Sequence, residues 1–151
     1  MSMQDVHEIR NLLYEYCWRI DSGDFDGVCD LLKDADISYG GKLTYSKDPK
    51  GYMMTLKPIV RYEDGTTKTC HMCIDPIIEV AEDGVNATAR SYTVVLQGIT
   101  GQMEPKIIWI DRKYDTLVKE NGKWRFATRN FVSRAEGDTS HHLDMSVFKR
   151  K

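Results

Sequence analysis

The stretch that decides the fold is Thr66–Val80, TTKTCHMCIDPIIEV, where the sequence pattern changes to a period of two. This period predicts a β-strand, because alternate side chains share one face of a sheet. Pro76 cannot donate to a strand ladder, so it predicts a bend or bulge inside this strand. Three further strands are expected at residues 85–97, 107–119 and 123–134.

The turns between these strands predict antiparallel pairing. Glu82–Gly84 reverses the chain after the first long strand, and Asn121–Gly122 is a strong signal for a two-residue hairpin. Residues 98–106 are expected to form a loop. Long strands that carry a bulge make a strongly bent sheet.

Helices are expected before the long strands. Residues 5–20 carry apolar side chains at steps of three and four, which predicts a helix capped by Asp5. A second helix is expected after its cap Asp24, and a third after its cap Ser46. A short strand, 36–39, lies between them and ends at a double glycine. This order favours an α+β fold, in which helices fill the concave side of the sheet and leave a pocket.

The composition is that of one globular domain. We expect a single domain over residues 1–151, with a core at about 5–134 and a polar, mobile tail after Ala135. The net charge of -2 argues against a nucleic-acid groove.

No apolar run approaches the roughly 20 residues that span a bilayer. The N-terminal residues do not form a signal peptide, so we expect no membrane partner and a cytoplasmic location. The cysteines lack the spacing of a secreted scaffold and are expected to be reduced: Cys17, Cys29, Cys70 and Cys73.

His71 is the first candidate catalytic residue. It stands within the first long strand, and Thr69 and Cys73 share its face. If that face is concave, His71 points into the pocket, where an imidazole is suited to act as a general base near neutral pH. The alternative is a core histidine that is hydrogen-bonded to a neighbour.

Asp21 is the second candidate, because it ends the apolar face of the first helix. A carboxylate at a helix C-terminus is unfavourable with the helix dipole, which suggests another partner. A hydrogen bond from His71 would fix the imidazole tautomer and favour its charged form. The alternative is an ordinary helix-end or capping residue.

The tyrosines near the apolar face of the first helix are further candidates. Tyr16 lies on the apolar face of the first helix. It is either a proton donor for a substrate oxygen or a residue of the packed core. Tyr14 stands two helical turns before Asp21 and shares its face more closely than Tyr16 does. The tyrosines that compete with Tyr16 for this role are Tyr14, Tyr45 and Tyr52.

The remaining candidates concern the pocket wall. Arg129 alternates with Ala127 and Phe131, which suggests an inward-facing side chain that would need a carboxylate partner. The alternatives are that it binds an acidic substrate tail or the phosphate of a coenzyme A thioester, or that it forms an ion pair at the surface or the sheet end. Met54 and Trp109 are expected to line the pocket or the core.

No metal site and no cofactor are expected. Cys70 and His71 point to opposite sides of a strand, so the Cys70-His71-x-Cys73 pattern does not supply the four ligands that zinc prefers. No glycine-rich phosphate loop follows a strand. His141 and His142 lie together in the polar tail and are interpreted as incidental.

Several blocks together resemble the SnoaL-like branch of the nuclear-transport-factor-like superfamily. Their order and spacing over about 5–134 carry the resemblance, and no single block is specific. The blocks are Ile9-x-x-Leu12-x-x-x-Tyr16, Ile20–Phe25, Thr69–Met72, Ile77–Gly84, Asn86–Tyr92, Tyr114-x-x-x-Val118, Gly122–Phe126 and Arg129. The resemblance implies a cystatin-like cone, with a curved antiparallel sheet around the N-terminal helices and one internal pocket.

The resemblance also implies site residues. In the bile-acid dehydratases of this superfamily a tyrosine, an aspartate five residues later, a strand histidine and a late arginine form the site. Tyr16, Asp21, His71 and Arg129 are similar to that set. The second histidine of the scytalone dehydratases has no counterpart, because Val94–Leu96 stands in its place.

The expected function is therefore a cofactor-free dehydratase that acts on a cyclic, apolar carbonyl compound such as a steroid or polyketide. A double-bond isomerase of the ketosteroid type and a non-catalytic binding protein of the same fold remain alternatives. The expected partners are a hydrophobic small molecule and a second copy of the chain. The homodimer would form through the convex sheet face, with Trp109, Val94 and Val118 as candidate contacts.

Overall fold

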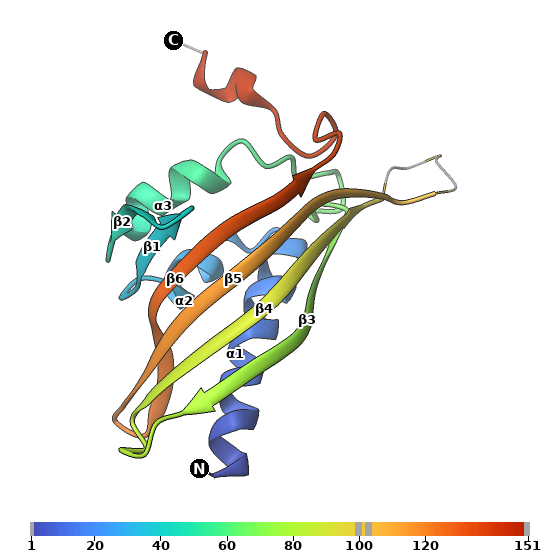
Figure 1. Ribbon diagram of the computed structural model, residues 1–151. Helices are drawn as coiled ribbons and strands as arrows, with labels where there is room; N and C mark the ends of the chain where they lie inside the picture. The colour runs from blue at the N-terminus through green and yellow to red at the C-terminus, as the bar shows by residue number, and fades with distance from the viewer. Residues whose placement is uncertain (1, 99–100, 102–103, 150–151) are drawn as a thin grey trace.

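The computed structural model describes residues 2–98, 101 and 104–149. The α-helices are α1 (Met3–Asp21), α2 (Phe25–Leu31) and α3 (Pro49–Leu56). The strands are β1 (Asp36–Tyr39), β2 (Lys42–Ser46), β3 (Thr69–Val80), β4 (Asn86–Gln97), β5 (Lys106–Glu120) and β6 (Lys123–Glu136), and a 3-10 turn, η1 (Met145–Phe148), follows. Figure 1 shows the helices on one side of a single bent sheet. None of the described helices is both long and apolar enough to cross a bilayer.

The sheet has six strands in the order β2-β1-β6-β5-β4-β3. Strands β3 to β6 pair antiparallel with their sequence neighbours, as the turns predict. The sheet is nevertheless mixed, because β1 pairs parallel with β6. Strand β2 was not predicted: Gly40 and Gly41 both have positive φ and form the hairpin turn between β1 and β2.

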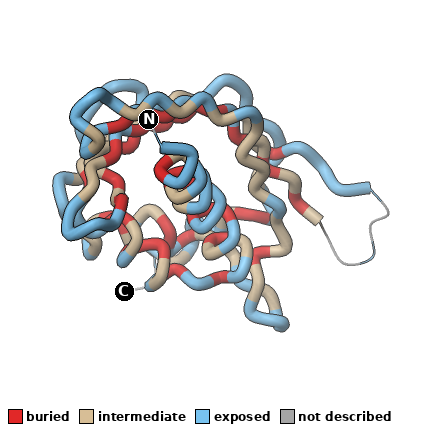
Figure 2. The backbone as a smooth tube through the Cα atoms, turned by 90° about the horizontal axis from the view of Figure 1, so that it is seen from below, coloured by how far each residue is buried: buried red, intermediate tan, exposed pale blue. Residues whose placement is uncertain are grey.

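Curvature comes from irregularities in the long strands. The β3–β4 register shifts between Ile74 and Ile77, at the bulge predicted for Pro76, and Asp75 has a φ of 46°. Further shifts interrupt the β4–β5 and β5–β6 ladders. Bulges bend a strand and increase its twist, so the sheet curls around α1. Figure 2 shows α1 end-on, enclosed by the rest of the chain.

The core lies between α1 and the concave face of the sheet. The buried face of α1 recurs at helical spacing, and buried residues of β4 alternate with exposed ones. The members of this core on α1 are Ile9, Leu13, Tyr16, Cys17 and Ile20, and those on the strands are Ile37, Ala87, Ala89, Leu117, Trp124, Phe126 and Phe131. The spacing of apolar residues along each helix and strand therefore decides which side chains meet in the core.

The start of α1 differs from the prediction. Ser2 caps the helix by accepting a hydrogen bond from the Gln4 backbone, and not Asp5. Asp5 is buried and accepts hydrogen bonds from Lys119 Nζ at 2.8 Å and Trp124 Nε1 at 2.9 Å. Those bonds hold the pKa of Asp5 below its usual value, with Lys119 as the larger cause. Asp5 thus ties the helix to the β5–β6 hairpin.

The start of α3 also differs. Asp48 caps this helix by accepting from the Gly51 backbone at 2.8 Å, and Pro49 stands at its first turn. Ser46, the predicted cap, ends β2 and donates to Asp36 at 2.7 Å. The unpredicted strand β2 occupies the residues before the helix, so the cap lies two positions later.

The segment after Ala135, predicted as a polar and mobile tail, pairs its backbone with an earlier part of the chain. Strand β6 continues to Glu136, and residues 137–144 turn back onto the segment that follows α3. The Val60 amide donates to the His142 carbonyl at 2.8 Å, and Ile59 forms an antiparallel bridge with Leu143. Backbone pairing, which composition does not reveal, holds this segment in place.

The buried face of α1 supplies the first testable prediction. Leu13 is completely buried, so Leu13→Ala should lower the free energy of unfolding by about 2–5 kcal/mol through lost burial and a residual cavity. Arg10→Ala, on the exposed side of the same helix, should change it by less than about 0.5 kcal/mol. Urea unfolding followed by circular dichroism measures both. Equal losses would contradict the assigned face.

Candidate active site

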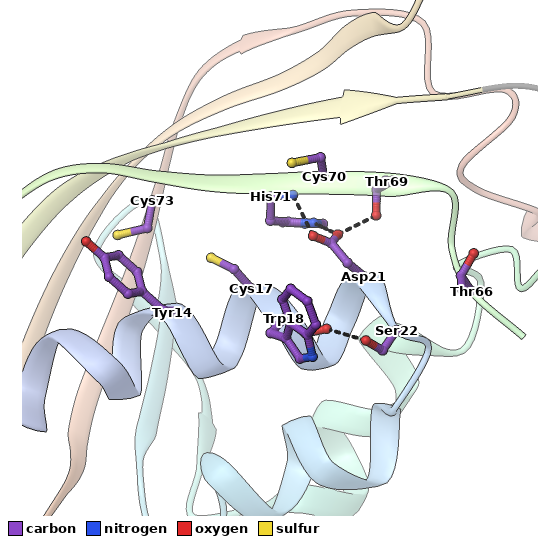
Figure 3. A pocket seen from close by; sticks show the side chains of 10 residues that line it. All are labelled: Tyr14, Cys17, Trp18, Asp21, Ser22, Thr66, Thr69, Cys70, His71 and Cys73. Carbon is purple, nitrogen blue, oxygen red and sulfur yellow. Dashed lines mark hydrogen bonds and ion pairs between the residues drawn. The ribbon is translucent and has the colours of Figure 1, made fainter.

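The candidate site forms where the end of α1 meets the start of β3. Asp21 is the last residue of α1, and Thr69 and His71 project from β3 towards it, whereas Cys73 lies further along the strand near Tyr14 (Figure 3). The His71 ring nitrogen Nδ1 lies 2.6 Å from Asp21 Oδ1. Because an ionised carboxylate only accepts hydrogen bonds, Nδ1 carries the proton and Nε2 keeps a free lone pair. The predicted pair of imidazole and carboxylate is therefore present.

The Asp21 carboxylate is held by further donors. Its Oδ2 accepts the His71 backbone N–H at 2.8 Å, and its Oδ1 accepts the Thr69 hydroxyl at 2.6 Å. Behind Thr69, the hydroxyl of Thr67 lies 2.6 Å away and extends the chain of hydrogen bonds. Donors of this kind offset the unfavourable position of a carboxylate at a helix C-terminus.

A glycine lets the chain turn sharply behind Asp21. Gly23 has a φ of 72°, in the left-handed region, and a Cβ at this position would lie 2.2 Å from the Gly65 carbonyl oxygen. Only a residue without a side chain fits there. Gly23 therefore lets the end of α1 approach the turn before β3, which places Asp21 at His71.

A cavity of about 480 Å³ opens between α1 and β3 at this pair. Its lining residues are Tyr14, Cys17, Trp18, Asp21, Ser22, Thr66, Thr69, Cys70, His71 and Cys73. The His71 side chain is only 9% exposed, whereas Trp18 is 75% exposed. The histidine thus lies deep in the cleft and the tryptophan at its mouth.

The structure separates the candidate tyrosines. Tyr14 lines the cavity, as its two-turn spacing from Asp21 predicts, whereas Tyr16 does not. Tyr16 is buried, and its hydroxyl lies 3.3 Å from that of Tyr52 in the core. Burial raises the pKa of both phenols well above the usual value. A five-residue step turns about 140° around a helix, so Tyr16 faces away from the Asp21 side.

Tyr45 also lies apart from the cavity. Its hydroxyl is 2.9 Å from that of Thr55, and its ring meets the edge of the Tyr52 ring. Tyr45 and Tyr52 therefore belong to the packing between β2, α3 and the core.

Arg129 lies inside the cone, 2% exposed, and not at a sheet end. Its Nε is 3.4 Å from Asp115 Oδ1, and its guanidinium lies 4.1 Å from the centre of the Tyr16 ring. Neither Nε nor Nη1 of Arg129, and neither carboxylate oxygen of Asp115, makes a hydrogen bond with the described residues. Burial raises the pKa of Asp115 and lowers that of the neighbouring Lys113.

Two thiols of the cavity lining lie within electrostatic reach of Arg129. Cys17 and Cys73 line the cavity, and Arg129 lowers the pKa of each, although burial is the larger effect. The net result for Cys17 is a pKa raised to about 11. Both thiols are therefore protonated at neutral pH, and they act as small apolar walls and not as nucleophiles.

Two predicted lining residues lie elsewhere. Met54 is on α3, 47% exposed, and does not line this cavity. Trp109 does not line it either, although it lies in one cross-strand row with Val95 and His71. Directly paired residues share a face, so Trp109 is on the concave side and is not a contact of the convex face. The cavity lies between α1 and β3, so a residue of β5 such as Trp109 can share the concave face without lining it.

One buried histidine was not predicted, because it comes from the C-terminal segment. His142 is 6% exposed, and burial, with a smaller contribution from the His71 charge, lowers its pKa to about 4. The only signal in the sequence was the apolar Leu143 beside it in a polar segment.

The described residues contain no group of three or more His, Cys, Asp or Glu side chains placed to hold a metal ion. Cys70 is exposed and Cys73 is half-buried, and both thiols are free.

The fold and the cleft together define a class: small α+β proteins in which a curved sheet encloses a helix and presents polar groups to a pocket. The chain belongs to the SnoaL-like domain family, whose pattern matches residues 1–130. This match confirms the resemblance predicted from the sequence blocks. No curated protein sequence gives a significant match.

Solved structures share the fold at low sequence identity. A protein of unknown function with a cystatin-like fold from Nostoc punctiforme has a TM-score of 0.70 and 19% identity, over 89% of this chain and 94% of that one. The "Putative Scytalone Dehydratase" of Novosphingobium aromaticivorans has a TM-score of 0.69 and 19% identity, over 90% and 88%. ActVI-ORFA from Streptomyces coelicolor has a TM-score of 0.67 and 18% identity, over 85% and 96%.

The Asp21–His71 bond predicts a fixed tautomer. In the native chain, ¹⁵N spectra of the imidazole should show His71 protonated at Nδ1 and unprotonated at Nε2. Asp21→Asn should mix the tautomers, because an amide can donate as well as accept. Thr69→Val removes a hydrogen bond to the carboxylate but not the carboxylate, so it should keep the native tautomer. An unchanged spectrum in Asp21→Asn would refute this assignment.

The buried ion pair supplies a second prediction for this region. Asp115→Ala should lower the free energy of unfolding by about 3–5 kcal/mol, because it leaves Arg129 charged and without its carboxylate. The double variant Asp115→Leu with Arg129→Met should lose less than the single variant, because it removes both charges. Urea unfolding measures the loss of both variants. A double variant that loses more than Asp115→Ala would show that the two side chains are not coupled.

Proposed function

We propose that the protein is a cofactor-free lyase that removes water from a cyclic, mostly apolar carbonyl compound such as a steroid or polyketide. The observation that carries this proposal is the 2.6 Å contact between His71 Nδ1 and Asp21 Oδ1 beside an open cavity. An imidazole oriented by a carboxylate is a general base suited to neutral pH.

The proposed reaction starts with removal of a proton next to the carbonyl. His71 Nε2 takes this proton, and Asp21 stabilises the imidazolium that forms. Tyr14, the tyrosine that lines the cavity, donates a hydrogen bond to the carbonyl oxygen as negative charge develops on it. The electron pair then forms the carbon–carbon double bond, the carbon–oxygen bond breaks, and His71 returns its proton to the leaving hydroxide as water.

The cavity suits a compact ring system. Its volume of about 480 Å³ lies within the range of small-molecule sites, about 300–1,000 Å³. Trp18, Tyr14 and the thiols of Cys17 and Cys73 give it aromatic and apolar walls. The structural neighbour named for scytalone dehydratase supports the choice of dehydration.

A double-bond isomerase is the second candidate. Dehydration and isomerisation begin with the same proton abstraction, and an isomerase needs only one base to carry the proton between two carbons. Among the described lining residues, His71 is the only imidazole, so a single base fits the lining. Release of water distinguishes the lyase, whereas an isomerase gives a product of unchanged mass.

His71 tests the proposal directly. We expect His71→Ala to lower turnover at least about 10²–10⁴-fold, the usual contribution of a positioned acid–base group. The assay incubates the protein with a panel of cyclic β-hydroxy ketones, including steroids and aromatic polyketides, and detects loss of water by mass spectrometry. Retained turnover in a folded His71→Ala variant would exclude the mechanism.

The matched control is His7→Gln, because His7 is an exposed histidine on α1 whose ring nitrogen lies 3.3 Å from the Asn11 side-chain amide. It should leave turnover unchanged. If panel compounds bind in the cleft but none is converted, the protein is a binding protein of this fold and not a lyase. Convex-face dimerisation stays a prediction, and its remaining candidates, Val94 and Val118, can be tested by charge substitution and sedimentation.

A further inference from the structure

The cavity of the candidate site has two facing walls, one from α1 and one from β3. The lining residues of α1 stand at steps of three and four and therefore form one stripe of the helix: Tyr14, Cys17, Trp18 and Asp21. The lining residues of β3 that share one face of the strand alternate along it: Thr69, His71 and Cys73. A cavity between two facing walls suits a ligand that is thin in one direction.

Trp18 is the most exposed aromatic side chain of the helix wall. It is 75% exposed, and its indole makes no hydrogen bond and no ring contact with the part of the chain that the structure describes. Trp124, by contrast, is buried and donates its Nε1 to Asp5 at 2.9 Å. Packing against the rest of the chain therefore accounts for Trp124 but not for Trp18.

A second aromatic ring lies beside Trp18 on the same wall. Tyr14 stands one helical turn before it and is 43% exposed (Figure 3). Exposed rings leave a large apolar area in water, and a ligand that covers them removes that area from water. The wall can therefore bind a ring with Trp18 while Tyr14 reaches an oxygen on the same ligand.

The charge of the lining favours a neutral ligand. Among the lining residues that the structure describes there is no lysine or arginine, and Asp21 is the one carboxylate. An anionic group in this cavity would meet the Asp21 charge without a compensating cation. Recognition therefore depends on contacts with rings and on hydrogen bonds to neutral groups.

We propose that Trp18 is the specificity-determining residue of this site. Its indole stacks on a flat, uncharged ring of the ligand, so the site selects flat rings over puckered rings of the same size. Offset stacking needs two planar faces, and the axial C–H bonds of a saturated ring hold it away from an aromatic face. This inference rests on the proposed function, because it places the ligand in the same cavity with its carbonyl at Tyr14.

The test compares two ketones that share one carbon skeleton, α-tetralone with an aromatic ring and α-decalone with a saturated one. The full native chain should bind α-tetralone about fivefold more tightly, the affinity that one stacked ring pair contributes. Trp18→Leu keeps an apolar side chain but no flat ring, so it should remove this preference. Trp18→Phe should keep most of it. Titration followed by NMR measures each dissociation constant.

The control is Tyr92→Leu, because Tyr92 is an exposed aromatic residue of β4 that does not line the cavity. It should leave the preference for α-tetralone unchanged. Since Trp18 is exposed, Trp18→Leu should also leave the midpoint of thermal unfolding close to that of the parent.

Two results would overturn the inference. The first is a native chain without a preference for α-tetralone, and the second is a Trp18→Leu variant that keeps the parent's preference. If that variant also loses self-association in sedimentation, Trp18 is a contact with a second copy of the chain and not a ligand contact.

Turnover separates this inference from the proposed lyase. For a panel compound that is converted and carries an aromatic ring, Trp18→Leu should raise KM about fivefold with little change in kcat, because stacking acts equally on substrate and transition state. A fall in kcat at unchanged KM would overturn the stacking role. The expected binding preference without turnover of any panel compound would count against the lyase alone.

Discussion

The Asp21 carboxylate joins the two halves of this protein. It ends α1, and it accepts the His71 ring, the His71 amide and the Thr69 hydroxyl from β3. The helix is thereby fixed against the sheet at the point where the cavity opens. Without that contact, the imidazole would lack an orienting group, and the cleft between α1 and β3 would lack its innermost wall. The position of the end of α1 and the orientation of the His71 imidazole therefore both depend on the Asp21 side chain.

The interior of the cone is more polar than a core needs to be. Arg129, Lys113 and Asp115 are buried, and the two cations lie over aromatic rings. Buried charges of this kind are costly and are weak evidence for stability.

Periodicity predicted most of the fold, whereas contacts between distant segments escaped it. The helical face of α1, the long strands and the bulge at Pro76 follow from local pattern, whereas the pairing of Asp21 with His71 was favoured by the family resemblance. The resemblance suggested Tyr16, but helix geometry favours Tyr14. His142 was not predictable, because its place depends on how the chain returns after β6. Parallel pairing of β1 with β6 escaped prediction for the same reason.

Strand β3 is the last strand of the sheet, so one side of its backbone has no partner strand. Exposed strand edges invite pairing with another chain. Here Asp21 takes the outward N–H of His71, and the bulge at Ile74–Ile77 interrupts the edge further along. The carboxylate that orients the proposed base therefore also protects the molecule against fibril-like association, and selection for solubility alone would retain an acidic residue there even in a relative without activity.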